Sequence, residues 1–324
     1  MSSSIFSSPE VKKFLELTEK GLKKFLDTDV ALLLDVGNYI IDGGGKRLRP
    51  LLTMAVARGG GVTEGDLESR VVPLAVGIEY IHTASLLHDD VVDDADTRRG
   101  KKAAHKVFGN AVAVLTGDYM YANALYLYSE YGNQTMIKVV SEAVKLMAEG
   151  QLLEIKKIGE LIDEIEYFEI IDGKTSSLFG SASAVGALAS EKLKGHYYDW
   201  WNFGLYIGRA FQLIDDALDY EGNEKVLGKP AGQDLREGKV TYPLIAVLDK
   251  LDKEEVKRII LSGNEEEIKQ LVEKVKELGG VELTKERARA ELTKAKFILE
   301  RYQLENGMDR LLARLIDFIV ERTF

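Results

Sequence analysis

The chain has 324 residues, no cysteine and a formal net charge of −10, from 53 acidic and 43 basic residues. The lack of cysteine excludes disulfides, thiolate zinc sites and cysteine nucleophiles, and it fits a reducing cytoplasm. The acidic balance argues against nucleic acid as the partner, because phosphate backbones bind to broad basic surfaces. No run of about 18 apolar residues is free of charge, so we expect no membrane anchor.

Apolar residues recur three and four positions apart in long stretches such as 71–88 and 136–155. This period predicts amphipathic helices, and strand-like alternation is scarce. We therefore predict an all-α protein with a single domain over residues 1–324 and a disordered tail at 1–8. A cavity between helices is the expected place for a site.

The segment GGGKRLRP, residues 43–50, places Lys46, Arg47 and Arg49 directly after three glycines. Glycines let a backbone approach phosphate closely, and the arginine fork matches phosphate geometry. The spacing differs from that of a Walker loop. A solvated helix start has the same composition, so this segment alone does not identify a site.

Asp89, Asp90 and Asp93 end the apolar run 71–88 in the pattern Asp-Asp-x-x-Asp. At 3.6 residues per turn, Asp89 and Asp93 stack on one helix face with Asp90 beside them. Such carboxylates repel one another, and the carboxyl end of a helix disfavours negative charge. Mg²⁺ compensates both effects and binds through a few carboxylates plus substrate phosphates. The pattern therefore indicates diphosphate chemistry.

His88 adjoins this triad, and a His-Asp pair would also suit a metal-dependent phosphohydrolase. With only four histidines, the chain lacks the further ligands that such sites recruit. A plainer alternative is that His88 orients the aspartates. Asp94 and Asp96 extend the acidic run and are expected to be solvated.

A second copy of the pattern, Asp215, Asp216 and Asp219, ends another helix-like run in FQLIDDALDY. Basic residues occur near both copies: they are Arg98, Arg99, Lys174, Lys229 and Lys239. Alternating acidic and basic clusters suit a diphosphate that is bound through metal ions.

From GGGKRLRP to GKVTYPLI, residues 43–245, the order of these motifs closely resembles the trans-isoprenyl diphosphate synthases, or polyprenyl synthetases. The resemblance implies the isoprenoid synthase fold, with antiparallel helices around a central active-site cavity, in a homodimer, which we expect to be cytoplasmic. It implies condensation of isopentenyl diphosphate with an allylic diphosphate to an all-trans polyprenyl diphosphate. The expected steps are ionisation to an allylic cation, attack by the isopentenyl double bond, and loss of a proton.

The same resemblance assigns roles to individual residues. About three Mg²⁺ ions would be held by Asp89, Asp90, Asp93, Asp215, Asp216 and Asp219. The isopentenyl diphosphate pocket would consist of Gly45, Lys46, Arg49, His82 and Arg99. The allylic diphosphate pocket would consist of Arg98, Gln151, Lys174, Thr175, Gln212, Lys229 and Lys239. The implied catalytic residues are Asp89, Asp90, Asp93, Lys174, Asp215, Asp216 and Lys229. For Asp234, a metal contact and a structural role both stay open.

Product length should depend on the apolar tunnel below the first triad. Ala84 and Ser85 stand where short-chain relatives carry an aromatic plug, so we expect a product of twenty carbons or more. Tyr121, Leu125 and Tyr128 share one helix face by spacing, and Tyr128 matches the floor position of long-chain relatives. Ordinary core or dimer packing is the alternative for these tyrosines.

Two other functions use the same fold. A terpene cyclase also ionises a prenyl diphosphate but needs no isopentenyl pocket, and a non-catalytic subunit of a heteromeric synthase loses aspartates or basic residues. Both triads and the isopentenyl set are present here, so the chain-elongating synthase is favoured.

Overall fold

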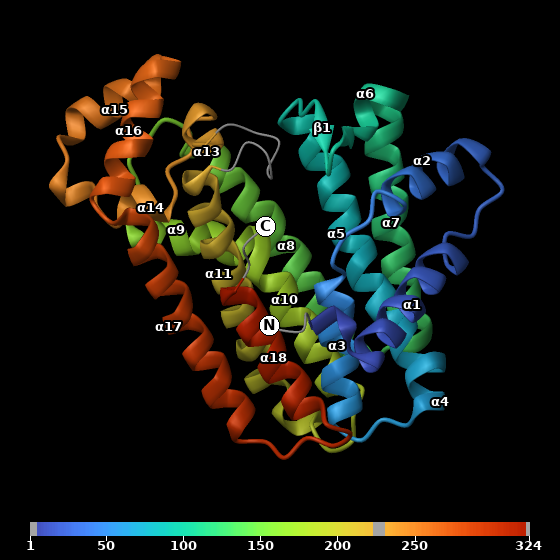
Figure 1. The fold of residues 1–324 in the computed structure, drawn as a ribbon. Coiled ribbons are helices and arrows are strands. Elements are labelled where there is room, and N and C mark those ends of the chain that lie inside the picture. Colours follow the sequence, from blue (N-terminus) through green and yellow to red (C-terminus); the bar gives the residue numbers. More distant parts are fainter. Residues whose placement is uncertain (1–4, 223–230, 322–324) are drawn as a thin grey trace. The chain divides into compact units, whose positions relative to one another are not determined.

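The computed structural model describes residues 5–222 and 231–321 (Figure 1). The described part is mostly helical, and its only strands are β1 (Thr97–Arg98) and β2 (Lys101–Lys102). The prediction of an all-α protein is therefore confirmed. The chain divides into two compact units: the first comprises Met1–Val144, Ser181–Trp201 and Gln303–Leu312, and the second comprises Lys145–Gly180, Asn202–Tyr302 and Ala313–Phe324.

The elements of the first unit are η1 (Ile5–Ser7), α1 (Pro9–Lys24), α2 (Ala31–Ile41), α3 (Leu48–Gly59), α4 (Glu64–Asp66), η2 (Leu67–Val71), α5 (Val72–Val92), β1, β2, α6 (Ala104–Phe108), α7 (Asn110–Tyr131) and η4 (Lys194–His196). Those of the second unit are α9 (Glu164–Ile171), η3 (Asp172–Ser176), α13 (Gln233–Arg236), α14 (Tyr242–Ile245), η5 (Leu248–Lys250), α15 (Lys253–Ser262), α16 (Glu265–Glu277) and α17 (Gly280–Glu300). The unit boundaries fall within α8 (Gln134–Lys156), α10 (Ser177–Leu188), α11 (Tyr197–Glu221) and α18 (Met308–Val320).

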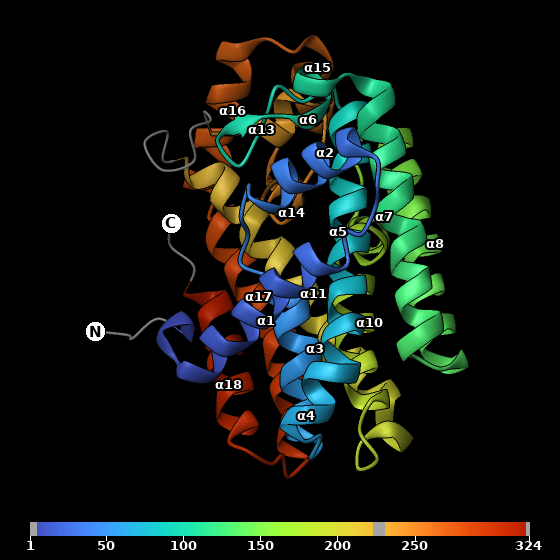
Figure 2. The same ribbon diagram turned by 90° about the vertical axis from the view of Figure 1, so that its right-hand side faces the viewer.

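Helix α5 is the central helix of the first unit and lies beside α7 in both views (Figures 1 and 2). The two helices approach closely at glycines: a Cβ on Gly77 would lie 2.8 Å from the Tyr128 ring, and one on Gly117 would lie 2.3 Å from His88 Nε2. Within the described residues, only the helical stretch Glu64–Val92 is long and apolar enough to span a membrane. Its apolar window is 78% buried, as in the core helix of a globular unit.

The amino-terminal segment differs in part from its prediction. Within the expected tail 1–8, residues Ile5–Ser7 form the 3-10 helix η1, and Ile5 is buried. The physical reason is that an apolar side chain gains free energy by leaving water, which offsets the entropy lost on ordering so short a segment.

Candidate functional site

The first aspartate triad lies at the carboxyl end of α5, in the first unit. The helix ends at Val92, and the N–H of Asp93, its C-cap, donates to the carbonyl of Asp89 at 2.8 Å. Asp90 is 1% exposed, and its Oδ1 accepts from Arg98 Nε at 2.9 Å and also from Nη2. Its Oδ2 is buried with no hydrogen-bond partner among the described residues. A cation beside this oxygen would satisfy it.

The two adjacent arginines belong to a tight hairpin, Arg98 to its first strand and Arg99 to its loop. β1 and β2 pair Arg98 with Lys101, and the loop residues Arg99 and Gly100 have φ angles of 52° and 77°. Positive φ at both loop positions is the geometry that connects two-residue hairpins without splaying the strands. Arg98 turns toward Asp90, whereas Arg99 donates to the carbonyl of Gly44. The hairpin thus directs the neighbouring side chains to different groups.

The glycine-rich segment forms a turn before α3. Gly44 and Gly45 have φ angles of 77° and 152°, and a Cβ on Gly45 would lie 3.0 Å from the Arg99 guanidinium. The positive φ angles favour glycine at both positions, and the missing side chain leaves room for the Arg99 guanidinium. Lys46 follows on the exposed side of the turn.

Arg47, which received no role from the sequence, is buried at the N-cap of α3 with a φ of 47°. Its guanidinium donates to Glu79 Oε1 at 2.8 Å, to Glu19 Oε1 at 2.7 Å and to the carbonyl of Ile41 at 2.8 Å. The middle cation of the GGGKRLRP segment is thus a buried structural charge. Residue type and local spacing do not distinguish it from Lys46 and Arg49; only the family resemblance, which assigned those two to the isopentenyl pocket, left Arg47 out.

His82 lies on α5, two turns before the triad. Burial and the positive charges of Arg49, Arg99, Arg47 and Arg98 hold its pKa well below the usual value. The imidazole is therefore neutral at neutral pH, beside an excess of guanidinium groups. An anionic ligand would relieve the mutual repulsion of these cations.

His88 contacts α7. Its Nε2 lies 3.1 Å from the carbonyl of Val114 and 3.4 Å from Asp118 Oδ1, both on α7. These contacts, and the space that Gly117 leaves for the imidazole, are on α7, so they do not support the alternative that His88 orients the aspartates. Asp94 and Asp96 are exposed, as predicted, and pair with Lys106.

The second triad lies in the last two turns of α11, in the second unit. The Asp216 side chain is 3% exposed. Its Oδ2 accepts from the Tyr167 hydroxyl at 2.6 Å, and its Oδ1 accepts from Gln212 Nε2 at 2.8 Å. Gln212 in turn accepts from Thr175 Oγ1 at 2.9 Å. Burial raises the pKa of Asp216 to about 7, although both hydrogen bonds act in the opposite direction.

Asp219 and Asp234 extend this acidic group. Asp219 accepts the backbone N–H groups of Gln233 at 3.0 Å and Asp234 at 3.3 Å, so it caps the short helix α13. Burial, followed by the charges of Asp219 and Asp216, holds the pKa of Asp234 well above its usual value. Asp234, in the short helix α13, therefore lies beside the second triad.

A cavity of about 180 Å³ opens in the second unit beside these carboxylates. Its polar lining consists of Glu154, Lys157, Tyr167, Lys174, Thr175, Gln212, Asp216, Asp234, Lys239 and Thr241. Four of the residues predicted for the allylic diphosphate lie in this lining: Lys174, Thr175, Gln212 and Lys239. Gln151 lies outside it, Arg98 belongs to the first unit, and Lys229 lies outside the described residues.

Three ionisable lining residues were not singled out by the sequence: a carboxylate, a cation and a phenol. Glu154 accepts from Lys174 Nζ and lies 3.9 Å from Lys239 Nζ. Lys157 pairs with Glu166, which also forms the capping box of α9 with Asp163. Tyr167 reaches Asp216 from α9. None belongs to a recognisable motif, because the fold alone brings them to the cavity.

Two close backbone crossings place Lys174 and Thr175. A Cβ on Gly150 of α8 would lie 2.8 Å from the amide nitrogen of Lys174, and one on Gly208 of α11 would lie 2.6 Å from Ser176 Cα. The turn η3 between them is a π-helix, a rare form that often occurs at functional sites.

The residues predicted to set product length all lie in the first unit. Ala84 is fully buried on α5, and Ser85 Oγ donates to the carbonyl of His82. Tyr128 is fully buried on α7, and its hydroxyl donates to the carbonyl of Leu74 at 3.0 Å. Leu125, predicted to share a helix face with Tyr128, is 51% exposed, so it does not share the burial of Tyr128. Its direction differs from that of Tyr128 by about 60°, enough to bring it to the surface.

The donor set fits a hard divalent cation. Each predicted site contains carboxylates, Asp90 Oδ2 is unsatisfied, and Asp216, Asp219 and Asp234 have raised pKa values. Among the described residues, no three His, Cys, Asp or Glu side chains already converge as a metal site.

A helical chain with two such carboxylate sets, one followed by paired arginines and one beside a lysine-lined cavity, defines a metal-dependent enzyme that acts on diphosphates. The chain matches the polyprenyl synthetase family over residues 30–277. It therefore belongs to that family of Mg²⁺-dependent trans-prenyltransferases, which use isopentenyl and allylic diphosphates.

Individual relatives agree with this assignment. The chain is 40% identical over 275 residues to an octaprenyl diphosphate synthase of Escherichia coli, covering 83% of this chain and 84% of the relative. It is 33% identical over 322 residues to a short chain isoprenyl diphosphate synthase of Methanothermobacter thermautotrophicus, covering 96% and 97%. A polyprenyl synthase of Caulobacter crescentus, solved with calcium and isoprenyl diphosphate, superposes with a TM-score of 0.89 at 34% identity, covering 98% and 97%.

Proposed function

We propose that this trans-prenyltransferase adds isopentenyl diphosphate head-to-tail to an allylic diphosphate and releases an all-trans polyprenyl diphosphate of twenty carbons or more. The observation that carries the proposal is the cavity in the second unit, where Lys174 and Lys239 lie with Asp216 and Asp234. A diphosphate bridged by cations needs both kinds of group within one small space.

In this proposal, Asp89, Asp90, Asp93, Asp215, Asp216 and Asp219 hold about three Mg²⁺ ions, and Asp234 assists the second triad. The bound ions supply electrostatic stabilisation to the departing diphosphate. Lys174, Lys239 and Lys229 bind its oxygens directly, and Thr175 and Gln212 orient it. Arg98 and Gln151 complete the allylic set. The apolar part of the lining, Ile162, Ile170, Ile171 and Val240, keeps water from the reacting carbon.

The second substrate is assigned to the first unit. Gly45, Lys46, Arg49, His82 and Arg99 would bind isopentenyl diphosphate, and the neutral imidazole of His82 can donate a hydrogen bond to it. A neutral donor does not add to the repulsion among the arginines. This cationic group favours chain elongation over a terpene cyclase, which has no use for a second diphosphate.

Product length is inferred from the small side chains of Ala84 and Ser85, with Tyr128 as the deeper floor. The Escherichia coli relative is named as an octaprenyl synthase, which supports a product longer than fifteen carbons. We also propose that residues 1–324 act as one catalytic domain in a cytoplasmic homodimer without a stable membrane anchor. The family match runs through both units, which supports a single domain.

The test is incubation with labelled isopentenyl diphosphate, Mg²⁺ and, separately, dimethylallyl, geranyl, farnesyl and geranylgeranyl diphosphates, followed by mass analysis of the dephosphorylated products. We expect a ladder that ends at twenty carbons or more. Lys174→Gln should raise KM for the allylic substrate, whereas Lys257→Gln, which breaks the exposed pair with Glu160, should not. Consumption of a prenyl diphosphate without incorporation of isopentenyl units would refute the proposal.

A further inference from the structure

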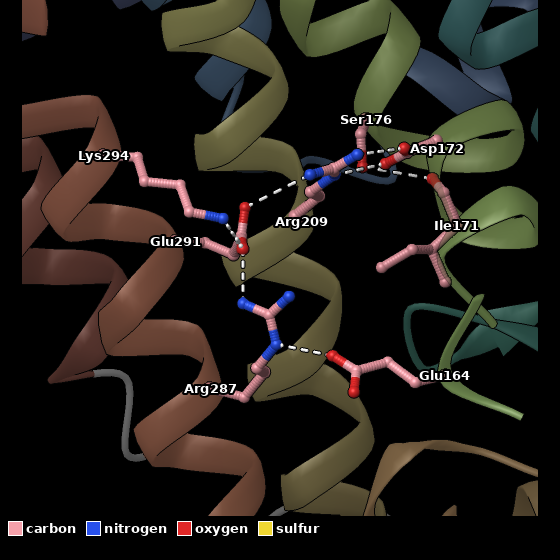
Figure 3. Close-up of polar contacts among 8 residues, drawn as sticks. All are labelled: Glu164, Ile171, Asp172, Ser176, Arg209, Arg287, Glu291 and Lys294. Atoms are coloured by element: carbon pink, nitrogen blue, oxygen red, sulfur yellow. Dashed lines mark hydrogen bonds and ion pairs between the residues drawn. The ribbon is translucent and has the colours of Figure 1, made fainter.

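A network of charged side chains lies in the second unit, on the side of η3 that faces α17 (Figure 3). Its members are Glu164, Asp172, Arg209, Arg287, Glu291 and Lys294. Glu291 is fully buried and accepts from Lys294 Nζ at 2.7 Å and from Arg287 Nη1. Three carboxylates and three cations balance in charge, so the network itself is no anion-binding site.

One ion pair connects this network to the turn that carries two cavity residues. Arg209 Nε donates to Asp172 Oδ1 at 2.7 Å, and its Nη2 donates to Oδ2. Such a forked pair fixes the angle between two groups as well as their distance. The remaining nitrogen, Nη1, lies 3.4 Å from Glu291 Oε2. Both side chains are largely withdrawn from water, with 21% and 28% exposure.

The Asp172–Arg209 pair lies close to two residues of the cavity lining. Asp172 is the first residue of η3, two and three residues before Lys174 and Thr175. Arg209 lies on α11 one turn before Gln212, which accepts from Thr175 at 2.9 Å. The ion pair and the Thr175 hydrogen bond therefore join η3 to α11 at two separate points. Two points fix the rotation of a short turn, which one point does not.

We propose that Asp172 and Arg209 are positioning residues: they hold η3 in the rotation that directs Lys174 and Thr175 into the cavity, and Glu291 holds Arg209. The inference rests on the proposed role of Lys174 and Thr175 in binding the allylic diphosphate. Loss of the pair should then weaken the use of the allylic substrate and leave isopentenyl diphosphate unaffected.

The kinetic test uses the full-length variants Asp172→Asn and Arg209→Gln, their double variant, and Arg209→Lys, which keeps the charge but loses the fork. Each single neutralisation should raise KM for the allylic substrate about 10-fold, with KM for isopentenyl diphosphate unchanged. The double variant should be no worse than the worse single one, because both remove the same interaction. Arg209→Lys should show a smaller rise.

Arg258→Gln is the matched control, because Arg258 forms a comparable forked pair with Glu267 that contributes nothing to the cavity lining. Hydrogen exchange of the substrate-free protein supplies a readout without catalysis. Amides 174–177 should exchange faster in the Asp172 and Arg209 variants than in the wild type or in Arg258→Gln.

Unchanged exchange at 174–177 would overturn the proposal, as would equal rises in KM for both substrates. Faster exchange with an unchanged allylic KM would reduce the pair to a structural role and would also overturn it. If Lys174→Gln had no effect on allylic KM, the proposed allylic pocket would fail, while the exchange data would still decide whether the pair holds the turn.

Discussion

At the scale of single residues, Asp216 is a buried carboxylate whose hydrogen bonds only partly offset the cost of its burial. Removing an ionised carboxylate from water is costly unless hydrogen bonds or cations compensate for it. Tyr167 and Gln212 each engage one of its oxygens, yet its pKa is still raised to about 7. The remaining cost is what a bound divalent cation would offset.

Tyr167→Phe should weaken metal binding at Asp216, because partners that orient a ligand typically contribute about 10- to 100-fold to metal affinity. We expect weaker Mn²⁺ binding to the substrate-free protein by electron paramagnetic resonance, and a higher Mg²⁺ requirement in the assay. Tyr80→Phe is the control, since the buried Tyr80 hydroxyl donates to the carbonyl of Leu22 at 2.6 Å. Equal Mn²⁺ affinity in the two variants would contradict the prediction.

The lowered pKa of His82 makes a prediction about pH. Below about pH 6.5 the unfolded chain binds a proton at this imidazole and the folded chain does not. The unfolded state then binds more protons, so stability falls as pH falls through this range. His82→Asn should lose less in Tm between pH 7.5 and pH 5.5 than the wild type. The exposed His196, replaced by Asn, serves as the control, and a wild-type-like loss in His82→Asn would disprove the assignment.

At the scale of elements, α5 and α7 are held together by small residues that let large ones fit between them. Gly77 admits the ring of Tyr128, and Gly117 admits His88. Ala84 lies seven residues after Gly77, which corresponds to about 10 Å along α5. Ala84 and the Tyr128 ring beside Gly77 would thus influence product length at different depths along α5.

Tyr128→Ala should lengthen the product by removing the floor. It should also cost about 3–5 kcal/mol of stability, as does truncation of other large buried aromatic residues. Mass analysis of the products and thermal unfolding measure the two effects. Leu125→Ala on the exposed side of α7 should change neither, and a longer product from that control would place the floor elsewhere.

Ala84→Phe should shorten the product, because an aromatic ring would block the space directly below the first triad. The same product assay detects the change as a ladder that ends earlier. Ser190→Ala is the control for a general loss of stability. It removes a buried hydroxyl that donates to the carbonyl of Gly60. An unchanged product from Ala84→Phe would show that Ala84 does not line the tunnel.

At the scale of the whole molecule, an exposed apolar face favours the proposed homodimer. Leu115 and Tyr126 on α7 are 65% and 61% exposed, and their spacing of eleven residues puts them on one helix face. Exposed apolar patches on helices commonly mark interfaces between subunits.

Leu115→Glu combined with Tyr126→Glu should therefore shift the protein toward monomer, because the interface would have to bury unpaired carboxylates among apolar side chains. Light scattering coupled to size-exclusion chromatography measures the mass. Phe297→Glu on α17, where the side chain is 66% exposed, should leave the dimer intact. A dimer that survives the double change would place the interface elsewhere.

The sequence by itself determined the helical class, the two triads at helix ends, and the set of basic residues around them. These depend on local periodicity and on short spacings, which act within one or two turns of chain. The order of the motifs then indicated the family, which the comparisons confirm.

Only the tertiary structure decided which side chains meet. Tyr167 reaches Asp216 across 49 positions, and Glu291 reaches Arg209 across 82. Arg47 and Arg49 look alike in sequence, yet burial beside Glu79 makes Arg47 structural. Such roles depend on long-range packing, because contact between distant segments depends on how whole helices fit together and leaves no local pattern in the chain.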